Sequence, residues 1–493
     1  MNTLADMPQV ICPRCSGKLD RGDSAFSCSV CRQRFPRMGD LLCFFADPTY
    51  HIQRFRVQQA VFNLQGQESD SVYEAELRKP ALLPETRARL EAQLAAVRSN
   101  IAELNAVVDP LLSEEATGVP ESGPAPEPGE VERFLVYFEL LLRDWGWSET
   151  ENQENARALA LIEEAIAASG RATAPLGHVL VLGSGASRLA YELHHKHRPA
   201  STTTIDVDIV LSGVAARMVR GDTLHLTEAP SDANRSGSVR AERTLRAPHG
   251  ALADFQVLLG DGLNPPFARD SFDTVLTPWF IDQVPDDLRD LVGVIDRVLK
   301  PGGRWINYGP VIFRKHVPLS RHYTIEEVTA LANLGGLEVG GVVQGEWPYL
   351  CSPLKLRGRH EVSFAFCATK ALRREARVTT DGSPAWLVLP HLPVATFPGS
   401  ALKSHPHSVY RRVLELLNGE TSISEIAEQL GKQANMNPVD LYDSIRAILI
   451  EVHPACAGLR ASAVVTTPWR CGRSRFQSQR RASGKSATAC SGG

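Results

Sequence analysis

The chain has 493 residues, enough for two to four domains and at least one large hydrophobic core. Its 53 basic and 56 acidic residues nearly balance, which argues against a generally polybasic protein of nucleic acids or membrane surfaces. No apolar run approaches the ~18 residues of a membrane span. The first ten residues lack the basic and apolar regions of a signal peptide, so we expect a cytoplasmic protein.

Two C-x-x-C pairs near the start of the chain predict a structural zinc site. Four thiolates from two such turns close a tetrahedral site and leave no open position for chemistry. Reduced cysteines of this kind fit a reducing cytosol. The segment is too short to build its own core, so the metal would supply its folding free energy. The predicted ligands are Cys12, Cys15, Cys28 and Cys31.

Helical patterns dominate the next hundred residues. Apolar residues from Leu83 to Val108 recur at spacings of three, four and seven, which indicates a helix packed on a domain. Residues 113–130 carry four prolines, several acids and almost nothing to bury, as a disordered linker does. Helical patterning then resumes over 131–168 and contains the tripeptide Arg143-Asp144-Trp145.

The stretch VLVLGSGASRLAYEL at 179–193 predicts a buried strand, a glycine turn and a helix N-terminus. This arrangement brings backbone close to a nucleotide-like ligand. A dinucleotide motif requires a third glycine where Arg188 stands, whereas the G-x-G-x-G form of S-adenosylmethionine (SAM) sites has Ser187 at its third place. By itself the glycine pair leaves both ligands open.

Four further strands alternate with helices, so we predict an α/β fold with a Rossmann-like parallel sheet and helices on both faces. The second strand ends in two acids on one face, Asp206 and Asp208, either of which could hold a ribose; we favour Asp208. Asp261 ends the third strand and could accept the adenine amine. The polar stretch 221–250 lacks periodicity and is interpreted as an insertion. A fourth strand at 271–282 and a fifth at 304–310 follow.

These elements together resemble the carnosine N-methyltransferase-like group of class I SAM-dependent methyltransferases, over about residues 131–370. The resemblance is carried by RDW (143–145), VLGSGASRLAYEL (181–193), GD (260–261), FDTVLTPWFID (272–282) and LKPGGRWINYGP (299–310). The N-terminal cysteine segment is similar to the zinc ribbons that precede some bacterial methyltransferase domains. In some of those proteins the ribbon contacts RNA, and five basic residues of this segment would permit that: Arg14, Lys18, Arg32, Arg34 and Arg37.

The resemblance implies roles for individual residues. Arg143 would bind the SAM carboxylate, Gly183 and Gly185 would line the methionine and ribose, and Asp208 would take the ribose. Asp261 and Gly262 would take the adenine end, and the same glycine turn adds Ser184 and Arg188 to the predicted cofactor site. Asp282 would anchor the acceptor. The chain departs from the family pattern at three places: Leu140, Ser187 and Phe313-Arg314.

Methyl transfer from a sulfonium is an in-line displacement, so positioning and water exclusion carry most of the catalysis. A base is needed only when the acceptor nitrogen begins protonated. Besides Asp282, the predicted catalytic residues are Arg314 and Tyr349, both after the fifth strand.

The C-terminal region predicts a short strand at 386–389 and three helices, at 408–417, 424–430 and 438–451. ISEIAEQLG resembles part of a winged-helix unit, but the third helix has one arginine against three acids, which favours docking of a protein over DNA. The predicted divisions are a zinc ribbon (8–45), a helical segment (51–112), a linker (113–130), a methyltransferase domain (131–372), a winged-helix-like docking domain (376–453) and a disordered basic tail (454–493).

The favoured function is N-methylation of a small molecule or peptide by SAM, on an imidazole- or amine-type nitrogen. A non-catalytic SAM-binding adaptor is one alternative, and an RNA methyltransferase guided by the zinc ribbon is another. The chain has no Asn/Asp-Pro-Pro-Tyr loop after the fourth strand, which argues against an RNA base methylase. The cofactors expected are SAM and a structural Zn²⁺.

Overall fold

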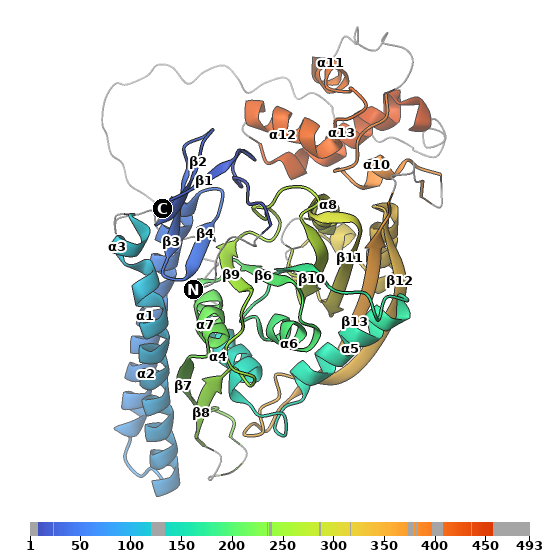
Figure 1. Cartoon of the computed structure of the whole chain (residues 1–493). Helices are drawn as coiled ribbons and strands as arrows, with labels where there is room; N and C mark the ends of the chain where they lie inside the picture. The colour runs from blue at the N-terminus through green and yellow to red at the C-terminus, as the bar shows by residue number, and fades with distance from the viewer. Residues whose placement is uncertain are drawn as a thin grey trace, which may run out of the picture.

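Eleven strands form one mixed sheet through the middle of the molecule, with helices on both faces (Figure 1). The computed structural model describes residues 8–22, 24–119, 134–233, 235, 239–284, 287–315, 317–372, 378–379, 382–396, 408–434 and 436–456. Most of the predicted linker (120–130) and nearly all of the predicted tail (457–493) therefore lie outside the described residues.

Five parallel strands make the centre of the sheet, in the order β9-β6-β5-β10-β11. These strands are largely buried, because a parallel sheet is covered on both faces. β5 has the apolar sequence HVLVL, whereas β6 (STTTID) buries a serine and three threonines. The bounds are β5 His178–Leu182, β6 Ser201–Asp206, β9 Phe255–Gly260, β10 Phe272–Pro278 and β11 Leu299–Gly309.

A long antiparallel pair completes one side of the sheet. β13 (Arg359–Lys370) pairs antiparallel with β11, and β12 (Leu337–Tyr349) pairs with β13 and forms the edge. The order of these seven strands, with β13 reversed, is that of a class I methyltransferase sheet. The fold class predicted from the sequence is confirmed.

The N-terminal ribbon is built into the other side of the same sheet. Its strands are β1 Leu19–Arg21, β2 Ala25–Cys28, β3 Arg34–Met38 and β4 Leu41–Phe44. β4 lies parallel to β9, with Leu42 opposite Leu258 and Phe44 opposite Gly260. Cys43, between them, is buried in this core and outside the zinc cluster. This continuity was not predicted.

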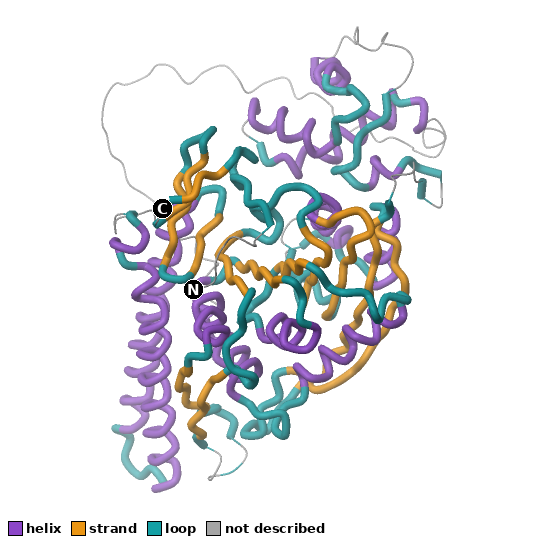
Figure 2. The backbone as a smooth tube through the Cα atoms, in the orientation of Figure 1, coloured by secondary structure: helices purple, strands orange, loops and turns teal. Residues whose placement is uncertain are grey.

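Two long helices, α1 (Pro48–Leu77) and α2 (Pro84–Leu112), form a hairpin along one flank and confirm the predicted helical segment (Figures 1 and 2). The hairpin is fixed to the body through Asn100, whose amide donates to the carbonyl of Thr227 and accepts from its N–H, at 2.8 and 2.7 Å. Thr227 belongs to β7 (Thr223–Glu228), which pairs antiparallel with β8 (Ala241–Arg246).

The β7–β8 pair lies within 221–250, the stretch interpreted as an insertion, and forms a two-stranded sheet of its own, outside the eleven-stranded sheet. Buried Leu224, Leu226 and Leu245 give this polar stretch a small apolar side that its sequence obscures. The remaining helices of the body are α3 Glu114–Thr117, α4 Phe134–Leu141, the π-helix η3 Leu142–Gly146, α5 Glu154–Ala168, α6 Arg188–His197, α7 Ile209–Arg220, α8 Leu288–Val298, the 3₁₀ helix η5 Leu319–Arg321 and α9 Ile325–Leu334.

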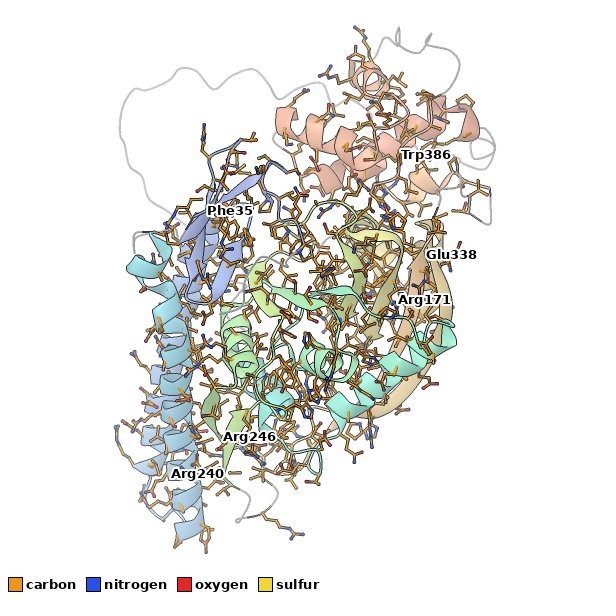
Figure 3. The ribbon with its side chains drawn as sticks, viewed as in Figure 1. Phe35, Arg171, Arg240, Arg246, Glu338 and Trp386 are labelled. Carbon is orange, nitrogen blue, oxygen red and sulfur yellow. The ribbon has the colours of Figure 1, made fainter. Side chains whose placement is uncertain are left out.

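The C-terminal unit consists of α10 (Ala385–Val388), α11 (Ser408–Glu415), α12 (Ile423–Ala434), α13 (Pro438–Val452) and a 3₁₀ turn, η7 (Pro454–Cys456). The predicted strand at 386–389 is instead the short helix α10, and Figure 3 shows its Trp386 among the C-terminal helices. Ser422 and Asn437 cap α12 and α13, because their side chains accept the N–H groups of Glu425 and Val439. A winged-helix relationship stays a prediction.

Among the described residues, no helix combines the length and apolar character that a membrane span requires.

Candidate functional site

The four predicted zinc ligands lie together in the ribbon. Their sulfur atoms are all within 4.8 Å of one another, with Cys12 Sγ 3.6 Å from Cys31 Sγ and Cys15 Sγ 3.5 Å from Cys28 Sγ. A tetrahedron with Zn–S distances of about 2.3 Å has edges of about 3.8 Å. The donor set and its spacing therefore fit a structural Zn²⁺.

The glycine turn sits between the carboxyl ends of β5 and β6. Gly183 and Gly185 both have positive φ angles, 65° and 55°, which glycine adopts at little cost. A Cβ atom at Gly185 would meet nothing within 4 Å, so this glycine faces open space. A Cβ at Gly183 would lie 2.1 Å from the ring of Phe280, and one at Gly262 would lie 2.8 Å from the same ring. Phe280 thus packs between two of the predicted cofactor glycines and is the immediate reason both lack a side chain.

The two acids after β6 have different positions. Asp206 is the last residue of β6, and its Oδ2 accepts the N–H of Gly185 at 2.7 Å. Asp208 is the N-cap of α7, and its Oδ1 accepts the N–H groups of Val210 and Leu211 at 2.9 Å each. The acid beside the glycine turn is therefore Asp206, and the residue favoured from the sequence, Asp208, begins a helix instead.

Burial sets the proton affinity of Asp206. Desolvation, followed by the nearby charge of Asp208, raises the pKa of Asp206 to about 6, against the pull of the backbone N–H groups it accepts.

Asp261 follows β9 directly and is exposed. Its Oδ1 accepts the N–H of Leu263 at 2.8 Å, which shapes the loop that leaves the strand. Asp206 ends β6 and Asp261 directly follows β9, its parallel neighbour. Both therefore lie at the carboxyl ends of the strands, where α/β proteins bind ligands.

Arg143 lies in the π-helix η3 and is 7% exposed. Such π-turns are frequent at functional sites. Its guanidinium donates to Asp144 Oδ1 at 2.7 Å and to Glu154 Oε1 at 3.1 Å, and it lies over the ring of Trp279 at 4.5 Å and that of Tyr349 at 5.9 Å. The two carboxylates keep the pKa of Arg143 well above its ordinary value despite burial. This cation is fixed in place with two aromatic neighbours.

The RDW tripeptide also braces the glycine turn. The indole N–H of Trp145 donates to the carbonyl of Ala186 at 3.1 Å. Arg188 donates to the carbonyl of Asp144, pairs with Glu192 at 2.7 Å and lies over the ring of Trp145 at 5.3 Å. Arg188, predicted as a cofactor residue, is thus engaged by protein groups and positions the turn. Ser184 accepts a hydrogen bond from Ser187 at 3.2 Å.

Asp282 lies in the loop after β10 and is 3% exposed. Its Oδ2 accepts the N–H of Ile312 at 3.1 Å and its Oδ1 accepts the amide of Gln283 at 3.1 Å. Gln283 in turn accepts from Arg314 at 2.6 Å. Burial raises the pKa of Asp282, while the Gln283 and Ile312 hydrogen bonds and the Arg314 cation lower it. Asp282 and the exposed Arg314 are therefore linked through Gln283.

Tyr349 ends β12, at the tip of the long hairpin that extends past the sheet. Its ring lies 4.4 Å from the guanidinium of Arg359 and 5.9 Å from that of Arg143. Burial raises the pKa of its hydroxyl. The residue after it, Leu350, donates its N–H to Glu154 Oε2 at 2.9 Å, which ties the hairpin to Arg143 through one carboxylate.

Three neighbours of the site were not singled out from the sequence: Glu154, Trp279 and Glu361. Trp279 has a φ of 47°, unusual for a bulky residue, and its buried indole N–H has no hydrogen-bond partner in the described chain. Its place in the PWFID segment could have indicated it. Glu361 is 8% exposed and holds Arg359 at 2.7 Å. Glu154 and Glu361 come from a helix start and a strand, where no sequence pattern marks them.

Part of the chain is similar to known methyltransferases. Residues 225–341 match the family model described as Carnosine N-methyltransferase. A carnosine N-methyltransferase of Dictyostelium discoideum is 40% identical over 60 residues, which are 12% of this chain and 12% of that protein. The aligned part thus spans about an eighth of the length of the curated relative.

Solved methyltransferases are more distant. A SAM-dependent methyltransferase of Methanosarcina mazei is 20% identical with a TM-score of 0.28, covering 40% of this chain and 93% of that one. Phosphoethanolamine N-methyltransferase 2 of Haemonchus contortus is 14% identical with a TM-score of 0.32, covering 51% and 61%. The strand order of the sheet defines the fold.

The sheet order and the arrangement at its carboxyl edge define a class I methyltransferase fold with an N-terminal four-cysteine ribbon. Within this class, the resemblance to the carnosine N-methyltransferase family predicted from the sequence is confirmed over residues 225–341.

Proposed function

We propose that the chain is a SAM-dependent methyltransferase that methylates a nitrogen atom of a small molecule or peptide. The single observation that supports this proposal is that Asp206, Asp261 and Asp282 all stand at the carboxyl ends of parallel strands of a class I methyltransferase sheet, with Arg143 over the ring of Trp279, which also follows β10.

The residues present fit the cofactor. Gly185 leaves open space beside the turn, and we infer that Asp206, rather than Asp208, accepts the ribose hydroxyls. Asp261 and Gly262 are the candidates for the adenine end, and Arg143 for the carboxylate. SAM, when bound, supplies a methyl group on a positively charged sulfur that an uncharged nitrogen can attack.

The protein's task is then to orient the acceptor and to receive its proton. Asp282 is held by the Ile312 N–H and by Gln283, so its carboxylate has one orientation. Because burial raises its pKa, Asp282 is a better proton acceptor than an exposed aspartate, and it can accept the N–H of an imidazole or amine. The rings of Trp279 and Tyr349 lie against the guanidinium of Arg143 and shield it on the sides that they cover.

The test is methyl transfer from SAM to a panel of imidazole- and amine-bearing small molecules and peptides, read by mass spectrometry. The Asp282→Asn variant should lose about a hundredfold in kcat/KM, the usual contribution of a general base, while its dissociation constant for S-adenosylhomocysteine (SAH) stays within twofold. Asp222→Asn, a surface change of the same chemistry, is the matched control.

The absence of SAM binding at tens of micromolar protein would reject the proposal. An Asp282→Asn variant with the activity of the wild type would reject the role of Asp282 as the proton acceptor. SAM bound but never consumed across the panel would favour the adaptor alternative, and salt-sensitive co-purification of RNA would favour the RNA methyltransferase alternative.

We further propose that the chain works in the cytoplasm, because zinc binding requires four reduced thiols. We also propose that α10–α13 form a docking unit for a protein partner. The unit is anchored by Leu389, which is fully buried against the methyltransferase core, and by Tyr442, whose hydroxyl donates to Asp290 of α8 at 3.2 Å. Loss of a co-purifying protein on mutation of the exposed side of α12 would support this role, and its retention would reject it.

A further inference from the structure

The loop that follows β9 contains two residues of the predicted cofactor site and also contacts the zinc ribbon. It runs from Asp261 to Ala268, and Asp261 and Gly262 are the predicted adenine-side residues. Hydrogen bonds join the ribbon to the residues at both ends of this loop. β9 and β4 lie side by side in Figure 1.

At its start, the loop is fixed by strand pairing. β4 of the ribbon lies parallel to β9 with three residue pairs in register, and the last pair is Phe44 with Gly260, the residue before Asp261. The direction in which Asp261 leaves the sheet is therefore set partly by a ribbon strand.

At its end, the loop is fixed by the segment that leads into the first zinc knuckle. Ile11 donates its N–H to the carbonyl of Pro266 at 2.9 Å, and Ala268 donates to the carbonyl of Gln9 at 3.1 Å. Ile11 immediately precedes the zinc ligand Cys12. A displacement of the knuckle would therefore displace the loop as well, because backbone hydrogen bonds connect the two.

In its middle, the loop contacts the knuckle itself. Asn264 donates its amide to the carbonyl of Pro13, between Cys12 and Cys15, at 2.8 Å. Near its end, the loop buries the side chain of Phe267 in the same apolar cluster as Cys12, Phe35 and Phe44 (Phe35 is labelled in Figure 3). Arg297 of α8 supports the far side, donating to the carbonyl of Pro265 at 3.0 Å.

We propose that the zinc ribbon is a metal-dependent positioning element of the cofactor site, which holds the Asp261–Gly262 loop in its binding conformation. The short ribbon has little core of its own, so bound Zn²⁺ supplies the free energy that keeps the knuckle folded. Without the metal, the loop keeps its Arg297 support but loses the fixed positions of Pro13 and Ile11. This inference rests on the proposed function, since it assumes that the loop contacts the cofactor.

The experiment measures SAH affinity of the full chain by calorimetry in three states: zinc-loaded, zinc-free after chelation, and zinc-restored. Zinc content is followed with a chromogenic chelator, and far-UV circular dichroism checks that the main sheet persists. We expect SAH to bind at least about tenfold more weakly in the zinc-free chain, the effect of several lost hydrogen bonds, and to recover when Zn²⁺ is added.

A variant isolates the contact from the metal. Asn264→Ala removes only the bond to Pro13 and should weaken SAH binding about two- to fivefold with zinc still bound, as expected for one exposed hydrogen bond. Asn105→Ala is the matched control. It removes the hydrogen bond that the Asn105 amide donates to Asn63 within the α1–α2 hairpin, and it should leave SAH affinity unchanged.

The outcomes separate the two proposals. SAH affinity that stays within twofold after complete zinc removal, with the sheet intact, overturns the inference and leaves the proposed function standing. If chelation also unfolds the sheet, the pair of variants decides, and equal SAH affinities for Asn264→Ala and Asn105→Ala overturn it. A zinc-loaded wild-type chain that binds no SAH overturns the proposed function and this inference with it.

Discussion

Ser187 shows how closely one backbone dihedral angle constrains the glycine turn. It stands where the resembling family has glycine, and its φ is 62°, in the left-handed region. A residue with a side chain pays about 1–2 kcal/mol for this conformation. Ser187 is only 1% exposed and bonds weakly to Ser184 and Thr204, at 3.2 and 3.3 Å, which offsets part of that cost. The departure from the family is therefore a tolerated strain within the fold.

Substitutions at Ser187 should separate strain from contact. Ser187→Gly relieves the left-handed strain but loses two long hydrogen bonds and adds unfolded-state entropy, so the free energy of unfolding should change by less than about 1 kcal/mol. Ser187→Val places a β-branched residue in a left-handed, filled site and should cost more than about 2 kcal/mol. Urea denaturation measures both; a valine variant as stable as the wild type would contradict this reading.

Arg314 is expected to act through Asp282 by electrostatics. Its cation lowers the pKa of Asp282, which burial raises. Removing the cation in Arg314→Ala should raise that pKa, so the acidic limb of the kcat/KM–pH profile should move to higher pH. Arg314→Lys retains the charge and should move the limb less. A profile that keeps its shape in Arg314→Ala while activity falls would indicate a structural role only.

At the scale of elements, the junction of β6 and α7 shows how two nearby acids come to bind different backbone groups. One residue separates Asp206 from Asp208, and their side chains share a face in an extended chain. The strand ends at Asp206 and the helix begins at Ile209, so Asp208 occupies the N-cap and turns its carboxylate to the helix. Only the position of that boundary decides which acid lies beside the glycine turn.

Alanine variants should separate the two acids. Asp208→Ala removes an N-cap and should lower the free energy of unfolding by about 1 kcal/mol, with SAH affinity within twofold of the wild type. Asp206→Ala should weaken SAH binding by at least about tenfold, because a charge-assisted hydrogen bond to the ribose is lost. Calorimetry and urea denaturation measure these effects. The reverse pattern would restore Asp208 as the ribose ligand.

The pH dependence of stability should also report on the end of β6. The pKa of Asp206 is raised to about 6 in the folded chain, from an ordinary 3.8. Its contribution to stability is therefore fully present below pH about 4 and is lost as the pH rises through 6, about 3 kcal/mol in total and about 2 kcal/mol between pH 4.5 and 7.5. Urea denaturation at pH 4.5 and 7.5 should show this loss in the wild type and not in Asp206→Asn. Equal pH dependence in both would contradict the assignment.

On the scale of the whole molecule, the ribbon and the methyltransferase sheet are one structure. The eleven strands run continuously from β1 to β12, with the β4–β9 pair as the joint. The α1–α2 hairpin crosses from the ribbon to α7 and β7 and adds a second connection (Figure 2). The segments predicted as a ribbon (8–45) and a methyltransferase domain (131–372) therefore contribute strands to one sheet. Their division into two domains stays a prediction.

This continuity predicts how the chain unfolds. Because zinc binds the folded ribbon, its removal should lower the Tm of the main unfolding transition by several degrees, through loss of the binding free energy linked to folding. Scanning calorimetry with and without a chelator measures this shift. A main transition whose Tm does not change while the zinc is lost would mean that the ribbon unfolds independently of the sheet.

Much of the fold followed from local sequence patterns. Local patterns predicted the five parallel strands, the C-x-x-C spacing predicted the cysteine cluster, and the apolar stripe from Leu83 to Val108 predicted α2, because each depends on residues near one another in the chain. Motifs also placed Arg143, Asp261 and Asp282 among the candidate site residues, since each adjoins the end of a predicted element or a recognisable tripeptide.

The tertiary structure alone decided the rest. The ribbon's strand β4 pairs with β9, more than two hundred residues later in the chain, and Glu154 and Glu361 reach the site from a helix start and a strand without any local mark. The β7–β8 pair formed where a polar stretch suggested none. Pairing, burial and capping between distant segments depend on which surfaces meet, and no periodicity within one segment carries that information.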